Sequence, residues 1–203
     1  MTDDRPHVAV IVGSGRRARF ADLPLEWLRG ALDARDDLLA SVIDLRDYEL
    51  PFYDLDVPPA KAGRTYGGNG ELARLGRAVD AADGFVIITP EYNHGYPALL
   101  KNALDHVFVE FNRKPVTFVS YGNVGGARAI EQLRLVAVEL EMAPLRHSVN
   151  IFPHSMIRAR SGEETPAAAF AEYDSKLGLA LDDLAWWSAA LRTARTRAAA
   201  TVS

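Results

Sequence analysis

The first residues that could do chemistry lie in segment 13–20, which joins a short apolar run to a helix-like stretch. Its glycines and Ser14 are small enough for backbone N–H groups to approach an anion, and a helix start adds partial positive charge. Arg16, Arg17 and Arg19 supply charge suited to a dianionic phosphate. An ordinary turn with a solvated basic face is the simpler interpretation, but arginines this close repel one another unless an anion neutralises them. We therefore predict a phosphate-binding loop.

The same loop also matches the dinucleotide fingerprint G-x-G-x-x-G/A through Gly13, Gly15 and Ala18. Asp44 would be the acidic residue that binds the ribose of such a ligand. It lies 26 residues beyond Ala18, whereas the motif places it about 20 residues on. Three arginines also exceed what a pyrophosphate at a helix N-terminus needs. An NAD-type site is therefore the weaker interpretation of this loop.

A second polar segment, residues 89–97, follows another apolar run and contains Pro90 and Pro97. Two prolines and a glycine restrict its backbone. Such a backbone can present N–H and C=O groups to the edge of a planar heterocycle while aromatic rings pack nearby. Tyr92 could equally pack beneath the loop, and His94 alone is more typical of a surface loop than of a catalyst. The segment predicts a wall for a flat, aromatic ligand.

A third polar segment, residues 120–126, contains Gly122, Gly125 and Gly126 directly before a helical pattern. N–H groups exposed by these glycines can stabilise negative charge on a bound ring, although a flexible turn is the simpler alternative. All three segments follow apolar runs. In parallel sheets, ligands bind at the carboxyl ends of the strands, so we expect the three segments to share one site.

The elements that must position these segments alternate between apolar runs and helical patterns. The runs predict buried strands at residues 8–12, 38–45, 84–89 and 115–120, with a weaker one at 145–151. Helical spacing of apolar residues predicts helices within 23–32, 71–82, 97–111, 127–141 and 165–195. The alternation predicts an α/β, flavodoxin-like fold: a five-stranded parallel sheet in the order 2-1-3-4-5 with helices on both faces, and a single domain over residues 1–203. Residues 46–70 show no periodicity, and so long a connection is typically functional or mobile.

Composition narrows the chemistry further. The chain has 203 residues, of which 48% are hydrophobic and 25% charged, and it has no cysteine. Thiolate catalysis, disulfides and cysteine-ligated metals are therefore excluded, and any redox chemistry must come from a bound cofactor. The net charge of −4 argues against a nucleic-acid partner. No apolar stretch is long enough to span a bilayer and the first residues do not resemble a signal peptide, so we expect a cytoplasmic protein without a membrane partner or metal site.

In this order, the three segments resemble those of the NADPH-dependent FMN reductase family, which comprises flavodoxin-like NAD(P)H:flavin/quinone oxidoreductases. The resemblance covers about residues 7–153, and its most specific part is T-P-E-Y-N followed by P and L-K-N-A-L-D within residues 89–105. The residues that carry it are Gly13, Ser14, Arg16, Arg19, Trp27, residues 89–93, Pro97, residues 100–105, Ser120, Gly122, Gly125, Gly126, Arg128 and Ala129.

The resemblance implies a bound FMN whose phosphate lies in the first loop. The isoalloxazine would then lie along the second loop, with its pyrimidine edge at the third. The cofactor-binding residues implied are Ser14, Arg16, Arg19, Phe20, Pro90, Glu91, Tyr92, Asn93, His94, Ser120, Tyr121, Gly122, Gly125 and Gly126. The chain departs from the family at Phe20 and Ala21, where members often carry a serine or threonine that can donate to the phosphate.

The activity implied is that of an FMN-dependent NAD(P)H oxidoreductase. Hydride would pass from NADPH or NADH to FMN and then on to a quinone, azo, flavin or similar small-molecule acceptor by a ping-pong route. No catalytic side chain is required, because the cofactor supplies the redox chemistry. Two alternatives stay open: a non-enzymatic FMN electron carrier, and an NAD-binding dehydrogenase built on Gly13, Gly15 and Asp44.

Two predicted helices carry more apolar residues than one buried helix face can accommodate, and this predicts self-association. These residues are concentrated at the end of the helix expected at 97–111, and Trp186 and Trp187 are adjacent in the last helix. Because proteins of the family it resembles are commonly dimers or tetramers, we expect a homodimer or homotetramer.

Overall fold

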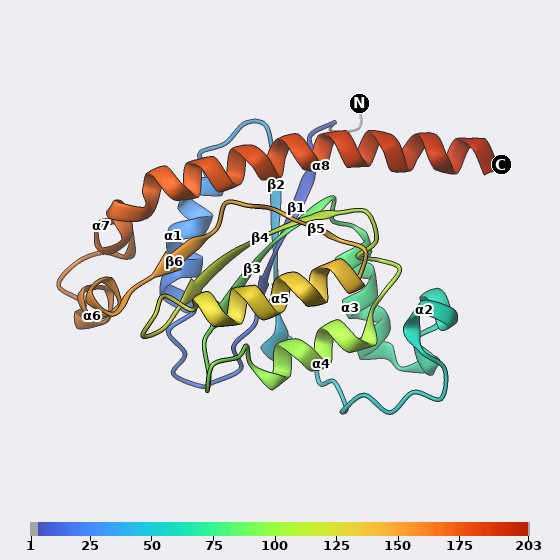
Figure 1. Ribbon diagram of the computed structural model, residues 1–203, viewed down its shortest axis with the longest axis horizontal. Coiled ribbons are helices and arrows are strands. Elements are labelled where there is room, and N and C mark those ends of the chain that lie inside the picture. The colour runs from blue at the N-terminus through green and yellow to red at the C-terminus, as the bar shows by residue number, and fades with distance from the viewer. Residues whose placement is uncertain (1–3, 203) are drawn as a thin grey trace.

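The computed structural model describes residues 4–202 and contains one parallel sheet in the order β2-β1-β3-β4-β5 (Figure 1). The order predicted from the sequence, 2-1-3-4-5, is confirmed, and the fold is flavodoxin-like. The strands are β1 (His7–Val12), β2 (Leu39–Asp44), β3 (Gly84–Pro90), β4 (Pro115–Tyr121), β5 (Ala143–Pro144) and β6 (Val149–Ile151).

The last position in the sheet differs from the prediction of one strand over 145–151. It holds two short pieces, because β5 pairs with the start of β4 and β6 pairs with its end, both in parallel. Between the pieces, the hydroxyl of Thr117 donates to the carbonyl of His147 at 2.7 Å. A side chain thus takes the place of a backbone partner there, and the strand is interrupted.

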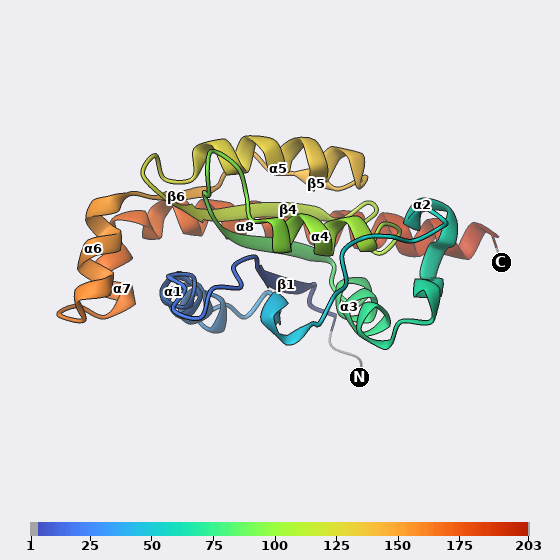
Figure 2. The ribbon, with the colours of Figure 1, turned by 90° about the horizontal axis from the view of Figure 1, so that it is seen from below.

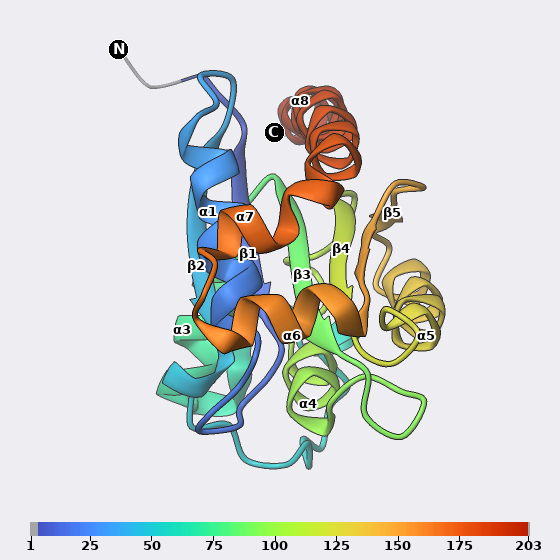
Figure 3. The same ribbon diagram turned by 90° about the vertical axis from the view of Figure 1, so that its left-hand side faces the viewer.

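Helices cover both faces of the sheet, which is why β3 and β4 are buried at every position. One face packs against α1 (Asp22–Asp33) and α8 (Asp174–Val202). The other packs against α3 (Gly70–Asp80), α4 (Ala98–His106) and α5 (Ala127–Glu139). Figure 3 looks at the sheet from the end where the strands finish, with α8 and α4 on opposite sides.

The region after the sheet corrects the prediction of one helix over 165–195. It contains α6 (Pro153–Ser161), which the sequence analysis missed, then α7 (Pro166–Phe170), a 3-10 turn at Ala171–Tyr173, and α8. The turn between α7 and α8 is where two aromatic rings enter the core, since Phe170 and Tyr173 are both buried. The Tyr173 hydroxyl accepts from the backbone N–H of Phe152 at 3.1 Å, which ties the start of α6 to this turn.

The long segment 46–70 contains one short helix, α2 (Pro59–Ala62), and runs along α4 (Figure 2). Asn102 of α4 holds it with both ends of its amide: the side-chain nitrogen donates to Pro51 O at 2.7 Å, and the oxygen accepts from Tyr53 N at 3.0 Å. Farther along, the Tyr66 hydroxyl donates to the buried carboxylate of Glu110. These contacts fix the segment on α4.

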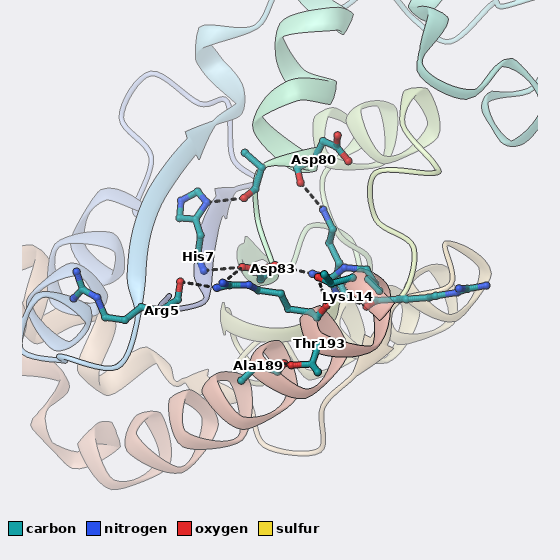
Figure 4. A network of polar contacts seen from close by, with 12 residues as sticks. Arg5, His7, Asp80, Asp83, Lys114, Ala189 and Thr193 are labelled. Carbon is teal, nitrogen blue, oxygen red and sulfur yellow. Dashed lines mark hydrogen bonds and ion pairs between the residues drawn. The ribbon is translucent and has the colours of Figure 1, made fainter. Parts of the chain in front are cut away.

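A polar network closes the edge of the sheet where the strands begin (Figure 4). The buried ammonium of Lys114 donates to Val79 O and Asp80 O at the end of α3, at 3.0 and 2.9 Å. Asp83 accepts from the backbone N–H of His7 at 3.0 Å and from Arg195 of α8 at 2.6 Å. The last helix is thereby joined to the first strand, at the edge opposite the three polar loops.

No helix within residues 4–202 combines the length and the apolar character needed to cross a membrane.

Candidate functional site

The loops after β1, β3 and β4 meet at the edge where the strands end (Figure 3). The hydroxyl of Ser14 in the first loop lies 3.2 Å from the hydroxyl of Tyr92 in the second. The backbone N–H of Glu91 donates to Tyr121 O at 3.0 Å, which joins the second loop to the third. The structure thus brings together the three segments in which the sequence analysis placed the site.

The three arginines of the first loop have different surroundings. Arg16 and Arg17 are exposed, and nothing in residues 4–202 forms an ion pair or hydrogen bond with their guanidinium groups. The side chain of Arg19 is 1% exposed, and it donates to Ser14 O at 2.9 Å and to both carboxylate oxygens of Asp44 at 2.7 and 2.6 Å. Arg19 therefore shapes the loop from beneath, while Arg16 and Arg17 remain available to an anion.

The carboxylate of Asp44 forms ion pairs with two arginines. Burial alone would raise the pKa of Asp44, but hydrogen bonds from Arg19 and Arg46 outweigh it and lower the pKa to about 2. The carboxylate accepts from Arg46 at 2.9 Å as well as from Arg19. It is therefore not free to bind a ribose, which disfavours the dinucleotide interpretation of this loop.

Replacing Asp44 with asparagine should destabilise the protein by about 2 kcal/mol at pH 7. A carboxyl with a folded pKa near 2 and an unfolded pKa of about 3.9 stabilises the fold above pH 4 and loses that effect as the pH falls through 2. Urea unfolding of both proteins should therefore give free energies of unfolding that converge between pH 4 and pH 2. Asp22→Asn, at a half-exposed partner of the same arginine, should cost less than about 1 kcal/mol. Equal stability of Asp44→Asn and the parent at pH 7 would contradict the argument.

The second loop is a preformed tight turn. Tyr92 and Gly95 exchange backbone hydrogen bonds of 2.8 and 3.0 Å. Between them, Asn93 (φ 49°) and His94 (φ 71°) adopt the left-handed conformation required at both central positions of a type I′ turn. Gln132 of α5 donates to His94 O at 2.9 Å and braces the turn. Both central side chains are exposed above the site edge.

The third loop depends on two consecutive glycines in the left-handed region, Gly125 (φ 66°) and Gly126 (φ 76°). A Cβ on Gly126 would lie 2.6 Å from the Cβ of Ser120, so no larger residue fits without movement. The Ser120 hydroxyl donates to Gly125 O at 2.6 Å, and the Asn150 amide donates to the same carbonyl at 3.1 Å. These hydrogen bonds hold the backbone in place directly before α5.

Glu91 connects the second loop to the third loop and to the start of α5. Its side chain is 5% exposed and accepts from Arg128 of α5, from Nε at 2.6 Å and from the backbone N–H at 3.2 Å. Pro90, the last residue of β3, lies opposite Tyr121 in the sheet. The carboxylate of Glu91 is therefore used to fix the two loops together, and only its backbone faces the site edge.

Two aromatic residues of the predicted set lie within the protein. Phe20 is 6% exposed and packs on Tyr121 with ring centroids 4.9 Å apart. The Tyr121 hydroxyl is buried near Ser14, but within residues 4–202 it forms no hydrogen bond of good geometry. Burial, and then the nearby Tyr92, raise the pKa of Tyr121, so the hydroxyl keeps its proton and can donate.

The donor set fits FMN. The first loop offers two unpaired arginines, the core beneath offers an unpaired hydroxyl, and the third loop offers a tightly packed glycine backbone with no side chains over it. These are suited to a phosphate, a polyhydroxyl chain and a planar ring, respectively.

The sequence analysis missed two contributors to this edge. Asn150 is a polar residue inside the short strand V-N-I, and that interruption is the signal that could have identified it. The other is α6, which lies beside the first and third loops (Figure 3). Its sequence, P-H-S-M-I-R-A-R-S, has little apolar periodicity.

Comparisons with known proteins point to one family. The sequence matches the family described as NADPH-dependent FMN reductase over residues 6–155. An NAD(P)H-dependent FMN reductase of Schizosaccharomyces pombe is 34% identical over 175 residues, which cover 85% of each chain. A quinone reductase of Escherichia coli K12 is 32% identical over 146 residues, which cover 68% of this chain and 72% of its own.

The solved structure of FerB, a flavoenzyme NAD(P)H:(acceptor) oxidoreductase from Paracoccus denitrificans, is similar in fold. Its TM-score is 0.69 at 24% identity, and the match covers 90% of this chain and 97% of that one. The sequence match extends over all three loops described above, and the structural match over the sheet that carries them. The chain therefore belongs to the NADPH-dependent FMN reductase family.

Proposed function

We propose that the protein is an FMN-dependent NAD(P)H oxidoreductase that passes electrons to a small-molecule acceptor such as a quinone, an azo compound or a free flavin. The observation that carries the proposal is the convergence of a phosphate loop with unpaired arginines, a rigid turn and a glycine-lined loop at one sheet edge. Membership of the family and the names of its relatives, an FMN reductase and a quinone reductase, support it.

In this proposal the first loop binds the phosphate of FMN. Arg16 would donate charge-assisted hydrogen bonds to the phosphate, together with backbone N–H groups at the start of α1. Ser14 and the hydroxyl of Tyr121 would donate to the phosphate or to the chain that leads from it. Arg19 is a positioning residue, because its guanidinium is bound to Ser14 O and to carboxylates. Phe20 is 6% exposed, so beyond its backbone it can offer a ligand only the small part of its ring that is not buried.

The other two loops would hold the ring. When bound, FMN supplies the redox chemistry. Residues 90–94 would lie along the ring, with Asn93 and His94 projecting from the turn and limiting access of water. Backbone N–H groups of Gly122 and Gly126 would face the pyrimidine edge and favour negative charge there. The N–H of Gly125 donates to Gly122 O at 2.9 Å, so Gly125 would contribute by shaping the loop. No protein acid or base is needed, and Glu91 is unsuited to that role because Arg128 binds its carboxylate.

An absorbance spectrum tests this function directly. The purified protein is incubated with FMN, desalted, and mixed anaerobically with NADPH or with NADH. We expect a retained flavin band that is bleached by at least one nucleotide. Retained flavin that neither nucleotide bleaches would instead support a non-enzymatic electron carrier. Absence of binding in an equilibrium FMN titration would overturn the proposal.

Self-association is a further part of the proposal, and its basis changes with the structure. Of the apolar residues at the end of the helix predicted over 97–111, Val107 and Phe111 are buried within the chain, where α4 has already ended at His106. Trp186 (66% exposed) and Trp187 (39%) remain at the surface, with ring centroids 5.4 Å apart. We expect sedimentation at micromolar concentration to show a homodimer or homotetramer; a monomer would contradict this. The cytoplasmic location stays a prediction, as does a single domain over residues 1–203.

A further inference from the structure

Beside the phosphate loop lies a hollow of about 170 Å³ whose lining comes from three parts of the chain. Phe20 comes from the end of the first loop, Asn123 from the third loop, and the rest from α6. We call it the α6 hollow; its residues are Phe20, Asn123, Pro153, Met156, Ile157 and Arg160. It adjoins the proposed flavin site on two sides, yet α6 is no part of the three loops that form that site.

Arg160 is the charged group of this hollow. Its guanidinium carbon lies 5.8 Å from the ring centroid of Phe20, which places a cation directly beside the phosphate loop. Within residues 4–202 nothing forms an ion pair or hydrogen bond with it. Arg158, two residues earlier on the same helix, is by contrast bound to Ala169 O at 2.9 Å and to Glu164. Arg160 is thus exposed and unpaired on a helix whose other nearby arginine is used structurally.

The helix that carries Arg160 is firmly anchored. The hydroxyl of Ser155 donates to Glu172 at 2.6 Å and lies 3.0 Å from the hydroxyl of Tyr173. Ser155 and Ala159 are buried, so this side of α6 faces the protein. The anchored helix fixes the backbone position of Arg160, so only the side chain has to be ordered when an anion binds.

The number of free cations exceeds what the flavin phosphate needs. That phosphate carries about two negative charges near neutral pH, and Arg16 and Arg17 of the first loop are unpaired. Arg160 is therefore a further cation at the same edge. The proposed reaction brings a second phosphate-bearing ligand to this edge, the nicotinamide dinucleotide.

The apolar part of the hollow indicates which chemical group of the ligand, next to its phosphate, would bind there. Ile157 is 70% exposed although it is a large apolar residue, and Met156 and the ring of Phe20 lie in the same lining. A space of this size is smaller than typical sites for whole ligands, which measure about 300–1,000 Å³, and suits one flat ring system. An exposed apolar wall beside a cation fits a purine ring with a phosphate on its ribose.

We propose that the α6 hollow binds the adenosine end of the NAD(P)H co-substrate, with Arg160 bound to one of its phosphate groups; this rests on the function proposed above. Asn123 belongs to the loop that would face the flavin ring, so a dinucleotide can extend from the ring into the hollow. The phosphate is either the 2′-phosphate, present only in NADPH, or the diphosphate that both nucleotides share. Arg160 is then a specificity residue in the first case and an affinity residue in the second.

Calorimetric titration of the FMN-loaded protein with adenosine 2′,5′-bisphosphate and with ADP tests the proposal without relying on turnover. Arg160→Gln should weaken binding of at least one probe by about tenfold, because a charge-assisted hydrogen bond is lost. Arg160→Lys should recover part of it. Weakening of the 2′,5′-bisphosphate alone assigns the 2′-phosphate, whereas equal weakening of both probes assigns the diphosphate. Steady-state kinetics should then show a raised KM for the matching nucleotide and an unchanged kcat.

Arg77→Gln is the matched control, because Arg77 is an exposed arginine on α3, away from the hollow. It removes the same charge and should change neither probe's affinity by more than twofold. The proposal is overturned if Arg160→Gln binds both probes like the parent, if the parent binds neither, or if the variant weakens FMN and not the nucleotides. Failure of NADPH and NADH to bleach the flavin of the parent would overturn the proposed function separately, since the titration does not depend on it.

Discussion

Replacing Arg16 and Arg19 together with alanine is expected to lower the affinity for FMN by about a hundredfold or more. Arg16 would lose a direct charge-assisted hydrogen bond to the phosphate, which is worth about 1.5–3 kcal/mol. Loss of Arg19 would release Ser14 O and leave the carboxylate of Asp44, which it now binds at 2.6 Å, with Arg46 as its remaining partner. The measurement is a fluorescence titration of FMN with the apoprotein.

The single variants separate the two contributions. Arg16→Ala should change the free energy of unfolding by less than about 0.5 kcal/mol, because the side chain is exposed and unpaired. Arg19→Ala should destabilise the protein by about 3 kcal/mol, because it breaks a buried ion pair. An unchanged FMN affinity in the double variant would remove the assignment of this loop to the phosphate.

Gly126→Ala is the second change with a large expected effect, a destabilisation of about 2–4 kcal/mol. A Cβ in the left-handed conformation costs about 1 kcal/mol. Crowding adds about 1–3 kcal/mol, because the new Cβ would lie 2.6 Å from the Cβ of Ser120 and 3.0 Å from Tyr121 N. Movement of the loop away from Ser120 should also weaken FMN binding. Urea unfolding and the FMN titration measure the two effects.

Gly162, at the end of α6, provides a matched control. It has the same φ of 76°, but a Cβ there would meet no atom within 4 Å. Gly162→Ala should therefore cost only the conformational part, about 1 kcal/mol, and leave FMN affinity unchanged. If both alanine variants lose equal stability, crowding against Ser120 is not what requires glycine at position 126.

The fold was predictable from the strands that are buried on both faces, because their sequences are typical of only one kind of element. The runs at β1, β3 and β4 are continuous and apolar because helices cover both sides of them. Right-handed crossovers leave few topologies, and the observed order is the simplest of these for five strands. The prediction failed at the fifth position, because the bond between the Thr117 hydroxyl and His147 O is a tertiary contact. It failed again at residues 165–195, where the helical pattern is continuous although the chain turns to bury Phe170 and Tyr173.

The location of the candidate site was predictable, but the partners of its side chains were not. Loop chemistry placed Ser14, Gly126 and the turn at Asn93 at one edge. That Arg19 binds Asp44, 25 residues away, and that Glu91 binds Arg128, depends on which strands are neighbours. Charged residues that look equivalent in the sequence thus divide into structural pairs and free groups only once the sheet is assembled.

The contacts between the last helix and the first strand also bear on how the protein is made. Leu177, Leu181 and Leu184 of α8 fill the core that covers one side of β1, and Arg195 binds Asp83 at the strand's starting edge. At about 5–20 residues per second, a ribosome needs about ten seconds or more to travel from β1 to the end of α8. During that time α1 can cover its part of this face, but the part that α8 covers has no helix over it. The native fold is therefore completed only once α8 has been synthesised, and until then the part of the apolar face that α8 covers is exposed and prone to aggregation.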